Sequence, residues 1–511
     1  MGDTIAAVAT GGGVSAIGIV RISGGEAIGA AEKLFSSVCG TKLRDAENRH
    51  MYYGELVGAD GGLIDLCLCA ISRGPSSYTG EDTVEFQCHG SPIVLSEVLL
   101  ALFSLGVRAA LPGEFTKRAF LNGRMDLTQA EAVIDLIEAE TPIAAQNAVG
   151  QLMGAVGKKL DTVYDMLLDV MAHFHAVIDY PDEDIDEFEM QGYLHVLTDA
   201  EDRLAQMLST YERGKVMRDG IPTAIIGRPN TGKSSLLNAL LGFDRAIVTD
   251  SPGTTRDTIE EKVLFGGILL RLIDTAGIRK TNDTIEQLGV DRALDAVKMA
   301  GLAIVVLDGS EPLREEDFDA LRSIPSDVPV VFAVNKSDLP QALTDDELLQ
   351  LTESRERNVK NSFSRLSTTN NEYPAPSHCH ICAINGKGLD TLEEAIKKTF
   401  PDLTPSPPIP YNLDQKLRPD LFEYCNFVPT PYSLLPNPCH QTILTNARQA
   451  DAIMRAKEGV TRAIEAIAAS TTPDAVLTDI EEALAAIGET TGKTMREDIV
   501  SRIFERFCVG K

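Results

Sequence analysis

Residues 221–241 read IPTAIIGRPNTGKSSLLNALL and set the architecture of the central part of this chain. The apolar run at 223–226 predicts a buried strand, and residues 235–241 predict an apolar helix. Between them, GRPNTGKS fits GxxxxGK[ST], a pattern whose glycines let backbone N–H groups surround phosphate oxygens at the start of a helix. The pattern predicts a phosphate-binding loop in which Lys233 reaches the terminal phosphates and the Ser234 hydroxyl ligates Mg²⁺.

Three further motifs follow in the order that a GTP site requires. The DTAG motif that begins at Asp274 closes a strand-like run, so this carboxylate can hold the Mg²⁺ shell and the motif's glycine can meet the γ-phosphate. The NKSD motif that ends at Asp338 fits NKxD, in which the carboxylate accepts from the ring N–H and the exocyclic amine of guanine. Adenine lacks that donor pair, so the motif selects GTP over ATP. Cys382-Ala383 stands where GTPases carry a Ser-Ala contact to the base, and the cysteine costs little because that contact is made by the main chain.

The loop GTTRD at 253–257 lies between the first two of these motifs. Thr255 is the best candidate for a switch threonine that ligates Mg²⁺ only when the γ-phosphate is present, and an ordinary polar loop is the alternative. Ile278 follows DTAG where Ras-like proteins carry a water-orienting glutamine. Because isoleucine cannot orient water, another group must neutralise the transition-state charge. Asn230 lies where some GTPases hold a K⁺ ion, and the residues that could complete its shell are Thr249, Ser251 and Thr254.

These motifs and loops together supply the predicted GTP-binding residues. They are Asn230, Thr231, Gly232, Lys233, Ser234, Ser235, Thr249, Asp250, Ser251, Pro252, Gly253, Thr254, Thr255, Asp274, Thr275, Ala276, Gly277, Asn335, Lys336, Asp338, Cys382 and Ala383.

Composition narrows the class of protein further. The 511 residues carry a formal net charge of −28, which argues against a broad electrostatic surface for nucleic acid but leaves room for a local basic groove. Nine scattered cysteines with no signal peptide before them indicate reduced thiols and a cytoplasmic location. No apolar run of about 18 residues or more occurs, so no membrane span is predicted.

Four regions are expected along the chain. Residues 1–120 predict a small α+β domain that binds a ligand or dimerises, and residues 121–216 predict helices. Residues 217–400 predict a doubly wound sheet, and residues 401–511 predict a proline-rich linker followed by helices. Helices on both sides of the GTPase segment suggest that it is inserted into a single helical domain.

Two stretches invite other interpretations. Residues 352–377 are polar and lack apolar periodicity, so they predict a loop insertion. HCHIC at 378–382 suggests a zinc site, but the chain offers no second CxxC to complete one, and Cys382 already belongs to the guanine loop. A zinc site is therefore the less favoured interpretation.

The chain as a whole resembles the MnmE (TrmE) family of tRNA-modifying GTPases. Besides the GTPase motifs, the residues that carry the resemblance are 4–10, 17–24, 78–82, 89–90, 112–123, 126–132, 253–257 and 507–511. The resemblance implies a multidomain α/β protein, with an N-terminal α+β domain that binds tetrahydrofolate and dimerises. It also implies an α-helical domain interrupted by a Ras-like, doubly wound P-loop G domain.

The same resemblance implies an activity and partners. The family works as a homodimer with an MnmG-type FAD and NADH protein, in a heterotetramer that modifies C5 of the wobble uridine of tRNA. An aminomethyl or carboxymethylaminomethyl group is added, and its one-carbon unit comes from a tetrahydrofolate derivative such as 5,10-methylene- or 5-formyl-tetrahydrofolate. GTP hydrolysis depends on K⁺ and Mg²⁺, which fits the missing glutamine.

Site residues follow from the resemblance position by position. The folate contacts correspond to Arg21, Glu85, Arg124 and the terminal Lys511, although Glu85 and Arg124 could instead be a surface acid and a helix cap. The catalytic residues correspond to Lys233, Thr255, Glu286 and Cys508. Glu286 would help to orient the attacking water, and Cys508 would be a candidate participant in the modification chemistry. An ordinary acid at a helix start and a structural cysteine are the alternatives for Glu286 and Cys508.

Two other functions remain open on sequence grounds. A regulatory GTP-binding switch of the ribosome-assembly type would not need the folate pattern or the terminal CxGK. A folate-binding scaffold with an inactive G domain is opposed by the intact Lys233, Ser234, Thr255 and Asp274. Residues 352–377 and 403–438 fit the family poorly, which leaves partner and tRNA contacts near them undecided.

Overall fold

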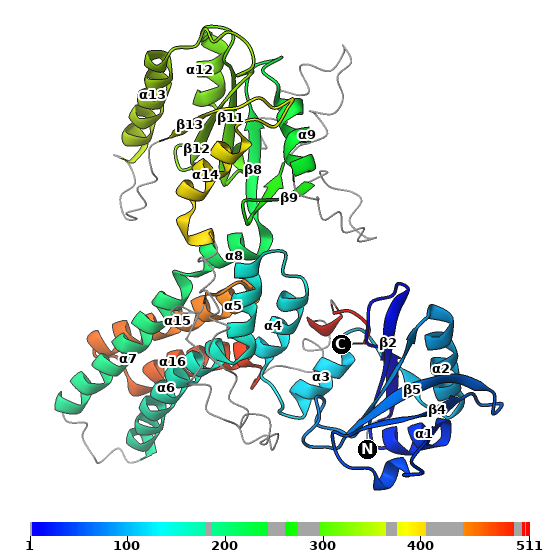
Figure 1. The fold of residues 1–511 in the computed structure, drawn as a ribbon. Coiled ribbons are helices and arrows are strands. Elements are labelled where there is room, and N and C mark those ends of the chain that lie inside the picture. The colour runs from blue at the N-terminus through cyan, green and yellow to red at the C-terminus, as the bar shows by residue number, and fades with distance from the viewer. Residues whose placement is uncertain are drawn as a thin grey trace, which may run out of the picture. The chain divides into compact units, whose positions relative to one another are not determined.

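The structure is a computed structural model, and it describes residues 3–179, 187–243, 261–273, 297–363, 376–404, 443–494, 503–505 and 507–510. The chain divides into two compact units (Figure 1). Unit 1 comprises Met1–Ile137, Ala148–Ser209 and Ala447–Lys511, and unit 2 comprises Glu138–Asn147 and Thr210–Asn446. The finer boundaries expected at residues 120, 216 and 400 stay a prediction.

Unit 1 contains a seven-stranded sheet in the order β3-β4-β5-β6-β2-β1-β7. The strands are β1 (Ile5–Val8), β2 (Ser15–Ser23), β3 (Phe35–Ser37), β4 (Met51–Val57), β5 (Leu63–Ser72), β6 (Thr83–Gly90) and β7 (Arg108–Ala109). Helices α1 (Ala27–Leu34) and α2 (Pro92–Ser104) pack on one side of this sheet, with the short η1 (Leu43–Asp45) beside α1. Alternation explains the arrangement, since Val84, Phe86 and Cys88 of β6 are buried against these helices while Glu85 and Gln87 point to the other side.

The remaining helices of unit 1 come from distant parts of the sequence. They are α3 (Glu114–Leu121), α4 (Leu127–Ile137), α6 (Ala155–Asp179), α7 (Glu187–Leu208), α15 (Ala447–Ala468) and α16 (Pro473–Thr491). Small residues let α15 and α16 approach closely, because a Cβ on Gly459 would lie 2.9 Å from the Asp479 carbonyl oxygen. Arg448 of α15 donates two 2.8 Å hydrogen bonds to Glu131 of α4. The helices before and after the central segment therefore belong to one body, and the predicted interruption of a helical domain is confirmed.

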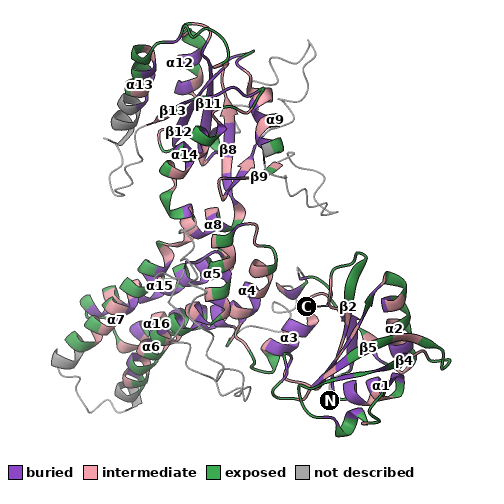
Figure 2. Cartoon of the chain, in the orientation of Figure 1, coloured by how far each residue is buried: buried purple, intermediate pink, exposed green. Residues whose placement is uncertain are grey.

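Unit 2 contains a six-stranded sheet in the order β13-β12-β11-β8-β10-β9, in which all neighbours are parallel except β9 and β10. The strands are β8 (Ile221–Ile226), β9 (Glu261–Phe265), β10 (Ile268–Leu272), β11 (Leu302–Asp308), β12 (Val330–Asn335) and β13 (Ser377–His380). Every residue of β11 and β12 is buried, as expected for central strands covered on both faces (Figure 2).

Helices cover both faces of this second sheet. They are α9 (Lys233–Phe243) and α14 (Leu389–Thr399) on one face, and α12 (Glu315–Arg322) and α13 (Asp345–Phe363) on the other. The helices α5 (Pro142–Leu152) and α8 (Tyr211–Asp219) and the short η2 (Pro401–Leu403) complete the described elements. The doubly wound P-loop fold is confirmed, and such a sheet binds ligands at the carboxyl ends of its strands.

One local prediction was wrong. The expected loop at 352–377 is helical as far as Phe363, and after the buried Leu348 and Leu351 helix α13 turns Arg355 inward. Residues 364–375 lie outside the described residues. The buried Arg355 donates 2.7 Å hydrogen bonds to the carbonyl oxygens of Ile324 and Val328, so the helix lacks the expected apolar period. Within the helices predicted over 121–216, α5 and α6 are separate, and Gly154 between them has a left-handed φ of 79°.

Among the described residues, no helix combines the length and the apolar character that crossing a bilayer requires.

Candidate functional site

The phosphate-binding loop joins β8 to α9, and two of its glycines lie against other strands. A Cβ on Gly227 would lie 2.3 Å from the Val306 carbonyl oxygen, and one on Gly232 would lie 2.1 Å from Asn335 Nδ2. Both glycines have positive φ angles, 151° and 98°. Asn230 also has a left-handed backbone, with φ 65°. The loop is therefore held in a conformation that most side chains would disrupt.

Lys233 begins α9 and folds back across this loop. Its Nζ donates to the carbonyl oxygens of Gly227 and Arg228, at 2.7 and 2.9 Å. Burial lowers the pKa of the Lys233 ammonium, as expected for a cation that is largely removed from water. The buried Thr231 hydroxyl donates to the same Arg228 carbonyl oxygen at 3.1 Å, which leaves the main chain of Thr231 as its means of contacting a ligand. Ser234 and Ser235 follow in the first turn of the helix.

The NKSD motif lies at the carboxyl end of β12, next to the phosphate-binding loop. The Asn335 Nδ2 group donates to the Thr231 carbonyl oxygen at 2.8 Å, and its Oδ1 accepts from the Ala383 N–H at 2.9 Å. One side chain thus ties the phosphate-binding loop to the loop at 382–383. The structure brings together the described members of the predicted nucleotide site.

Cys382 contributes more than the expected main-chain contact. Its buried thiol donates to Oδ1 of Asp338 at 3.2 Å, and the Asp338 side chain is otherwise exposed at the surface. A thiol is a weak donor, but it orients the carboxylate that is predicted to recognise guanine. The neighbouring Cys379 packs in the core, where burial raises the pKa of its thiol to about 11.

Sequence reasoning missed two residues beside this site. Asp308 ends β11 and pairs with Lys336 of the NKSD motif at 2.6 Å. Arg228, within the phosphate-binding loop, pairs with Glu311 at 2.7 Å and with Asp317 at 3.3 Å. An aspartate at the end of a wholly apolar strand run was the available signal for the first of these residues.

Several predicted site residues lie outside the described residues. They are Thr249, Asp250, Ser251, Pro252, Gly253, Thr254, Thr255, Asp274, Thr275, Ala276, Gly277, Glu286 and Lys511. Their predicted roles stay predictions, as does the K⁺ shell beyond Asn230.

The predicted folate residues lie in unit 1. Arg21 on β2 and Glu85 on β6 face each other across the two strands, and the Arg21 Nε donates to Glu85 at 2.7 Å. The rings of Tyr78 and Phe115 lie 5.5 and 5.7 Å from the Arg21 guanidinium, within cation–π range. The Arg124 side chain is exposed and passes close to Gly80 of the loop that carries Tyr78.

The described part of the C-terminal tail reaches the same sheet. The Gly113 N–H donates to the Cys508 carbonyl oxygen at 3.2 Å, and the Cys508 side chain is exposed. A Cβ on Gly510 would lie 2.1 Å from the Val8 carbonyl oxygen, in the strand beside Arg21. Gly510 of the tail therefore lies beside β1, the strand that pairs with β2, although the two come from opposite ends of the sequence.

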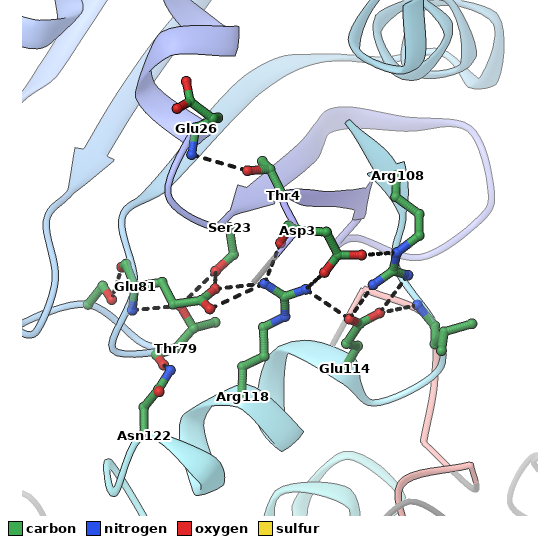
Figure 3. A network of polar contacts seen from close by, with 12 residues as sticks. Asp3, Thr4, Ser23, Glu26, Thr79, Glu81, Arg108, Glu114, Arg118 and Asn122 are labelled. Carbon is green, nitrogen blue, oxygen red and sulfur yellow. Dashed lines mark hydrogen bonds and ion pairs between the residues drawn. The ribbon is translucent and has the colours of Figure 1, made fainter. Parts of the chain in front are cut away.

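An ion-pair network centred on the buried Arg118 joins the loops of this region (Figure 3). Arg118 of α3 donates to the Asp3 carbonyl oxygen at 2.8 Å, to Glu81 at 2.9 Å and to Glu114 at 3.0 Å. Arg108 donates to Glu114 at 2.6 Å and to Asp3 at 2.5 Å. The sequence motifs at 78–82 and 112–118 are therefore joined through one guanidinium.

Two carboxylates of this network, Glu114 and Asp3, have lowered pKa values. Burial works against the charge of Glu114, but hydrogen bonds from Arg108, the Leu111 N–H and Arg118 outweigh it and lower its pKa below the ordinary 4.5. Hydrogen bonding to Arg108 is the main reason that the pKa of Asp3 lies below 3.8. A carboxyl group whose pKa is lower in the folded state stabilises the fold at pH values above its unfolded-state pKa. That stability is lost as the pH falls through the folded-state pKa.

Replacing Arg118 with methionine is expected to destabilise unit 1 by about 2 kcal/mol at pH 7, because Glu81 loses its arginine partner while Asp3 and Glu114 keep only Arg108. Denaturant unfolding of the full chain measures the change. The difference from the wild-type chain should shrink as the pH falls through the lowered pKa values of Asp3 and Glu114, where these carboxylates become protonated. The exposed Arg322, which pairs with two acids on the surface of α12, provides a matched arginine-to-methionine control with little expected effect. Equal losses in the two variants would contradict the prediction.

The fold and the site together define a P-loop protein with a guanine-recognition motif. Residues 127–508 match the family model described as MnmE helical domain, and residues 4–124 match the one described as GTP-binding protein TrmE N-terminus. The chain belongs to the MnmE family of tRNA modification GTPases.

Individual relatives match over the whole length. The tRNA modification GTPase MnmE of Clostridioides difficile (strain 630) is 38% identical over 509 residues, covering 100% of this chain and 99% of that protein. The protein of the same name from Alkaliphilus metalliredigens (strain QYMF) is 39% identical over 510 residues, with the same coverage. Among solved structures, the G domain of the T. maritima FeoB iron transporter is 23% identical and covers 35% of this chain and 96% of that chain. Its TM-score of 0.22 is too low to support an inference.

Proposed function

We propose that this protein is a K⁺-dependent GTPase that acts in the modification of C5 of the wobble uridine of tRNA. The observation that carries the proposal is the joined nucleotide site, in which Asn335 links the phosphate-binding loop to the base loop. That site occurs in a chain that matches tRNA modification GTPases from end to end.

The phosphate-binding loop suits a GTP–Mg²⁺ complex. Lys233 presents a partly desolvated ammonium at a helix N-terminus, where the backbone N–H groups also favour anions. The Ser234 hydroxyl in the first turn, together with Thr255, would hold Mg²⁺, which neutralises phosphate charge when it is bound. Glu286 would help to orient the attacking water. Asp338 would accept from guanine, with Cys382 supporting its carboxylate.

GTP hydrolysis is expected to be at least about tenfold faster in K⁺ or Rb⁺ than in Na⁺, because a fixed cation near the phosphates stabilises the transition state. Asn230, with its left-handed backbone in the phosphate-binding loop, is the proposed ligand, and Thr249, Ser251 and Thr254 would complete the shell. Steady-state phosphate release in matched chloride salts measures the effect, and Asn230→Ala should abolish the difference between the salts. Equal rates in Na⁺ and K⁺ for the wild-type protein would contradict the proposed K⁺ site.

The Arg21–Glu85 pair supports the proposed folate site. A guanidinium that two aromatic rings flank suits the carboxylates of a tetrahydrofolate tail, and a carboxylate suits the pterin N–H groups. Arg124 and Lys511 would complete the contacts to a methylene- or formyl-tetrahydrofolate. The exposed Cys508 would then be available to the modification chemistry.

The proposed partners are a second copy of this chain, an MnmG-type FAD protein in a heterotetramer, and tRNA, in the cytoplasm. A homodimer through unit 1 is favoured by the sheet face opposite α1 and α2, which exposes Ile17, Tyr53, Leu66 and Leu68. Monomers rarely leave large apolar side chains gathered in this way.

Mass analysis of wobble uridines tests the function as a whole. In tRNA from a strain that lacks this gene, reintroducing the wild-type chain should restore modification of C5, and the empty vector should not. Identical wobble uridines in the two strains would reject the role in tRNA modification while leaving GTP hydrolysis open.

A further inference from the structure

The connection between β11 and α12 contacts both halves of the nucleotide site. We call residues 308–317 the brace segment. At its first end, Asp308 Oδ2 accepts from the Lys336 ammonium at 2.6 Å, while Oδ1 accepts from the Ser310 N–H and hydroxyl at 3.0 and 2.6 Å. The Asp308 side chain is only 4% exposed. Burial alone would raise its pKa, but the hydrogen bonds from Lys336 and Ser310 outweigh it and lower the pKa, so the carboxylate stays charged.

Lys336 needs such an anchor because of its backbone. It lies inside the NKSD motif with a left-handed φ of 63°, a backbone conformation that is unfavourable for a residue with a side chain. The same turn is secured from the other side by Gln341, whose Nε2 donates to the carbonyl oxygens of Lys336 and Leu339 at 3.0 and 2.9 Å. The brace segment adds a backbone contact, since the Gly309 N–H donates to the Asn335 carbonyl oxygen at 2.9 Å. The turn that presents Asp338 is therefore tied to the end of β11.

The second end of the brace segment holds the phosphate-binding loop. Glu311 accepts from Arg228 at 2.7 Å and from Arg314 at 2.9 Å. The buried Asp317 lies 3.3 Å from the Arg228 Nε. The Arg228 side chain is only 6% exposed, and its carbonyl oxygen accepts from the Lys233 ammonium. Moving this arginine would move the backbone over which Lys233 is folded.

We propose that Asp308 is a positioning residue for guanine recognition, acting through Lys336, and that Glu311 at the other end of the brace segment separately positions the phosphate-binding loop through Arg228. The inference rests on the proposed GTP site and extends it to residues that lie outside every nucleotide motif. The two ends can be distinguished, because Asp308 hydrogen-bonds to Lys336 of the NKSD motif and Glu311 hydrogen-bonds to Arg228 of the phosphate-binding loop.

Two nucleotides distinguish the roles. Inosine diphosphate lacks the exocyclic amine that guanine offers to Asp338, so the ratio of GDP affinity to inosine diphosphate affinity reports how well that carboxylate is aimed. Both affinities are measured by calorimetry on the full-length protein. Asp308→Asn keeps the size of the side chain and removes its charge. It should weaken GDP binding about tenfold, the scale expected for losing one charge-assisted hydrogen bond, and inosine diphosphate binding much less. Glu311→Gln should weaken both nucleotides by one common factor and leave the ratio unchanged.

The controls separate positioning from folding. Asp319 on α12 pairs with Arg322 at the surface, so Asp319→Asn is a matched change that should alter neither affinity. Asp308→Glu retains the charge and should recover part of the GDP preference. If Asp308→Asn lowers both affinities equally, or neither, while the wild-type chain prefers GDP, the role of Asp308 is rejected and the proposed GTP site stands. If the wild-type chain fails to bind GDP, the proposed function and this inference fall together.

Discussion

Replacing Lys233 with alanine is expected to lower kcat/KM for GTP hydrolysis by about 10³-fold. Lys233 is the first residue of α9, and its ammonium contacts the phosphate-binding loop, where Nζ lies 2.7 Å from the Gly227 carbonyl oxygen. The terminal phosphates of GTP are expected to bind where this ammonium lies. In the alanine variant, the negative charge that develops on them in the transition state would lose its nearest cation. Much of the loss should appear in kcat, because the interaction strengthens in the transition state.

Phosphate release under single-turnover and steady-state conditions separates the binding loss from the catalytic loss. Lys397 on α14 is a suitable control, because it forms a surface ion pair with Glu393 and Lys397→Ala removes the same side chain far from the loop. A Lys233→Ala protein with a normal rate would show that the phosphate assignment is wrong. A melting temperature close to that of the wild-type chain would show that the variant is folded.

Replacing Asp338 with asparagine is expected to weaken GTP binding by about 10³-fold or more and to shift preference toward xanthosine triphosphate. The Asp338 carboxylate accepts from two guanine donors in the proposed complex, and an amide in its place would turn a donor toward a donor. Xanthine carries a carbonyl oxygen where guanine carries the exocyclic amine, so the introduced amide finds an acceptor there. The exposure of Asp338, and its single thiol contact from Cys382, leave the carboxylate free to meet a base.

Competition between labelled GDP and unlabelled xanthosine nucleotides measures the switch. Asp390, an exposed aspartate in the first turn of α14, offers a matched aspartate-to-asparagine control. Unchanged GTP affinity in Asp338→Asn would count against guanine recognition by this motif. A loss for both nucleotides, with no gain for xanthosine, would indicate damage to the loop instead.

Long-range pairs account for what sequence reasoning missed. Asp308 meets Lys336 from 28 residues away, and Arg118 meets Glu81 from 37 residues away. A sequence pattern indicates which side chains share a strand or a helix. It does not indicate which helices and strands end next to one another in the fold. Only a main-chain contact was expected from Cys382, and the contact of its thiol with Asp338 depends on how two loops pack against each other.

The error at 352–363 has a similar origin. Apolar periodicity predicts a helix when its inward face is hydrophobic, and beyond Leu351 helix α13 instead buries Arg355 against carbonyl oxygens of the connection between α12 and β12. From the sequence alone, a charged side chain at that position is interpreted as exposed to solvent, because the carbonyl oxygens that accept its hydrogen bonds are not known. The local polarity was interpreted correctly, and the burial was not.

By itself, the amino-acid sequence determined the phosphate-binding loop, the guanine motif and the family, because each depends on residue types within short contiguous segments whose backbone geometry is local. Tertiary structure alone decided which carboxylates brace Lys336 and Arg228, how Arg118 joins two separate motifs, and where the C-terminal tail meets the first sheet. Those contacts arise from the packing of distant segments, and their energies depend on burial and on the direction of side chains, neither of which is written in a local pattern.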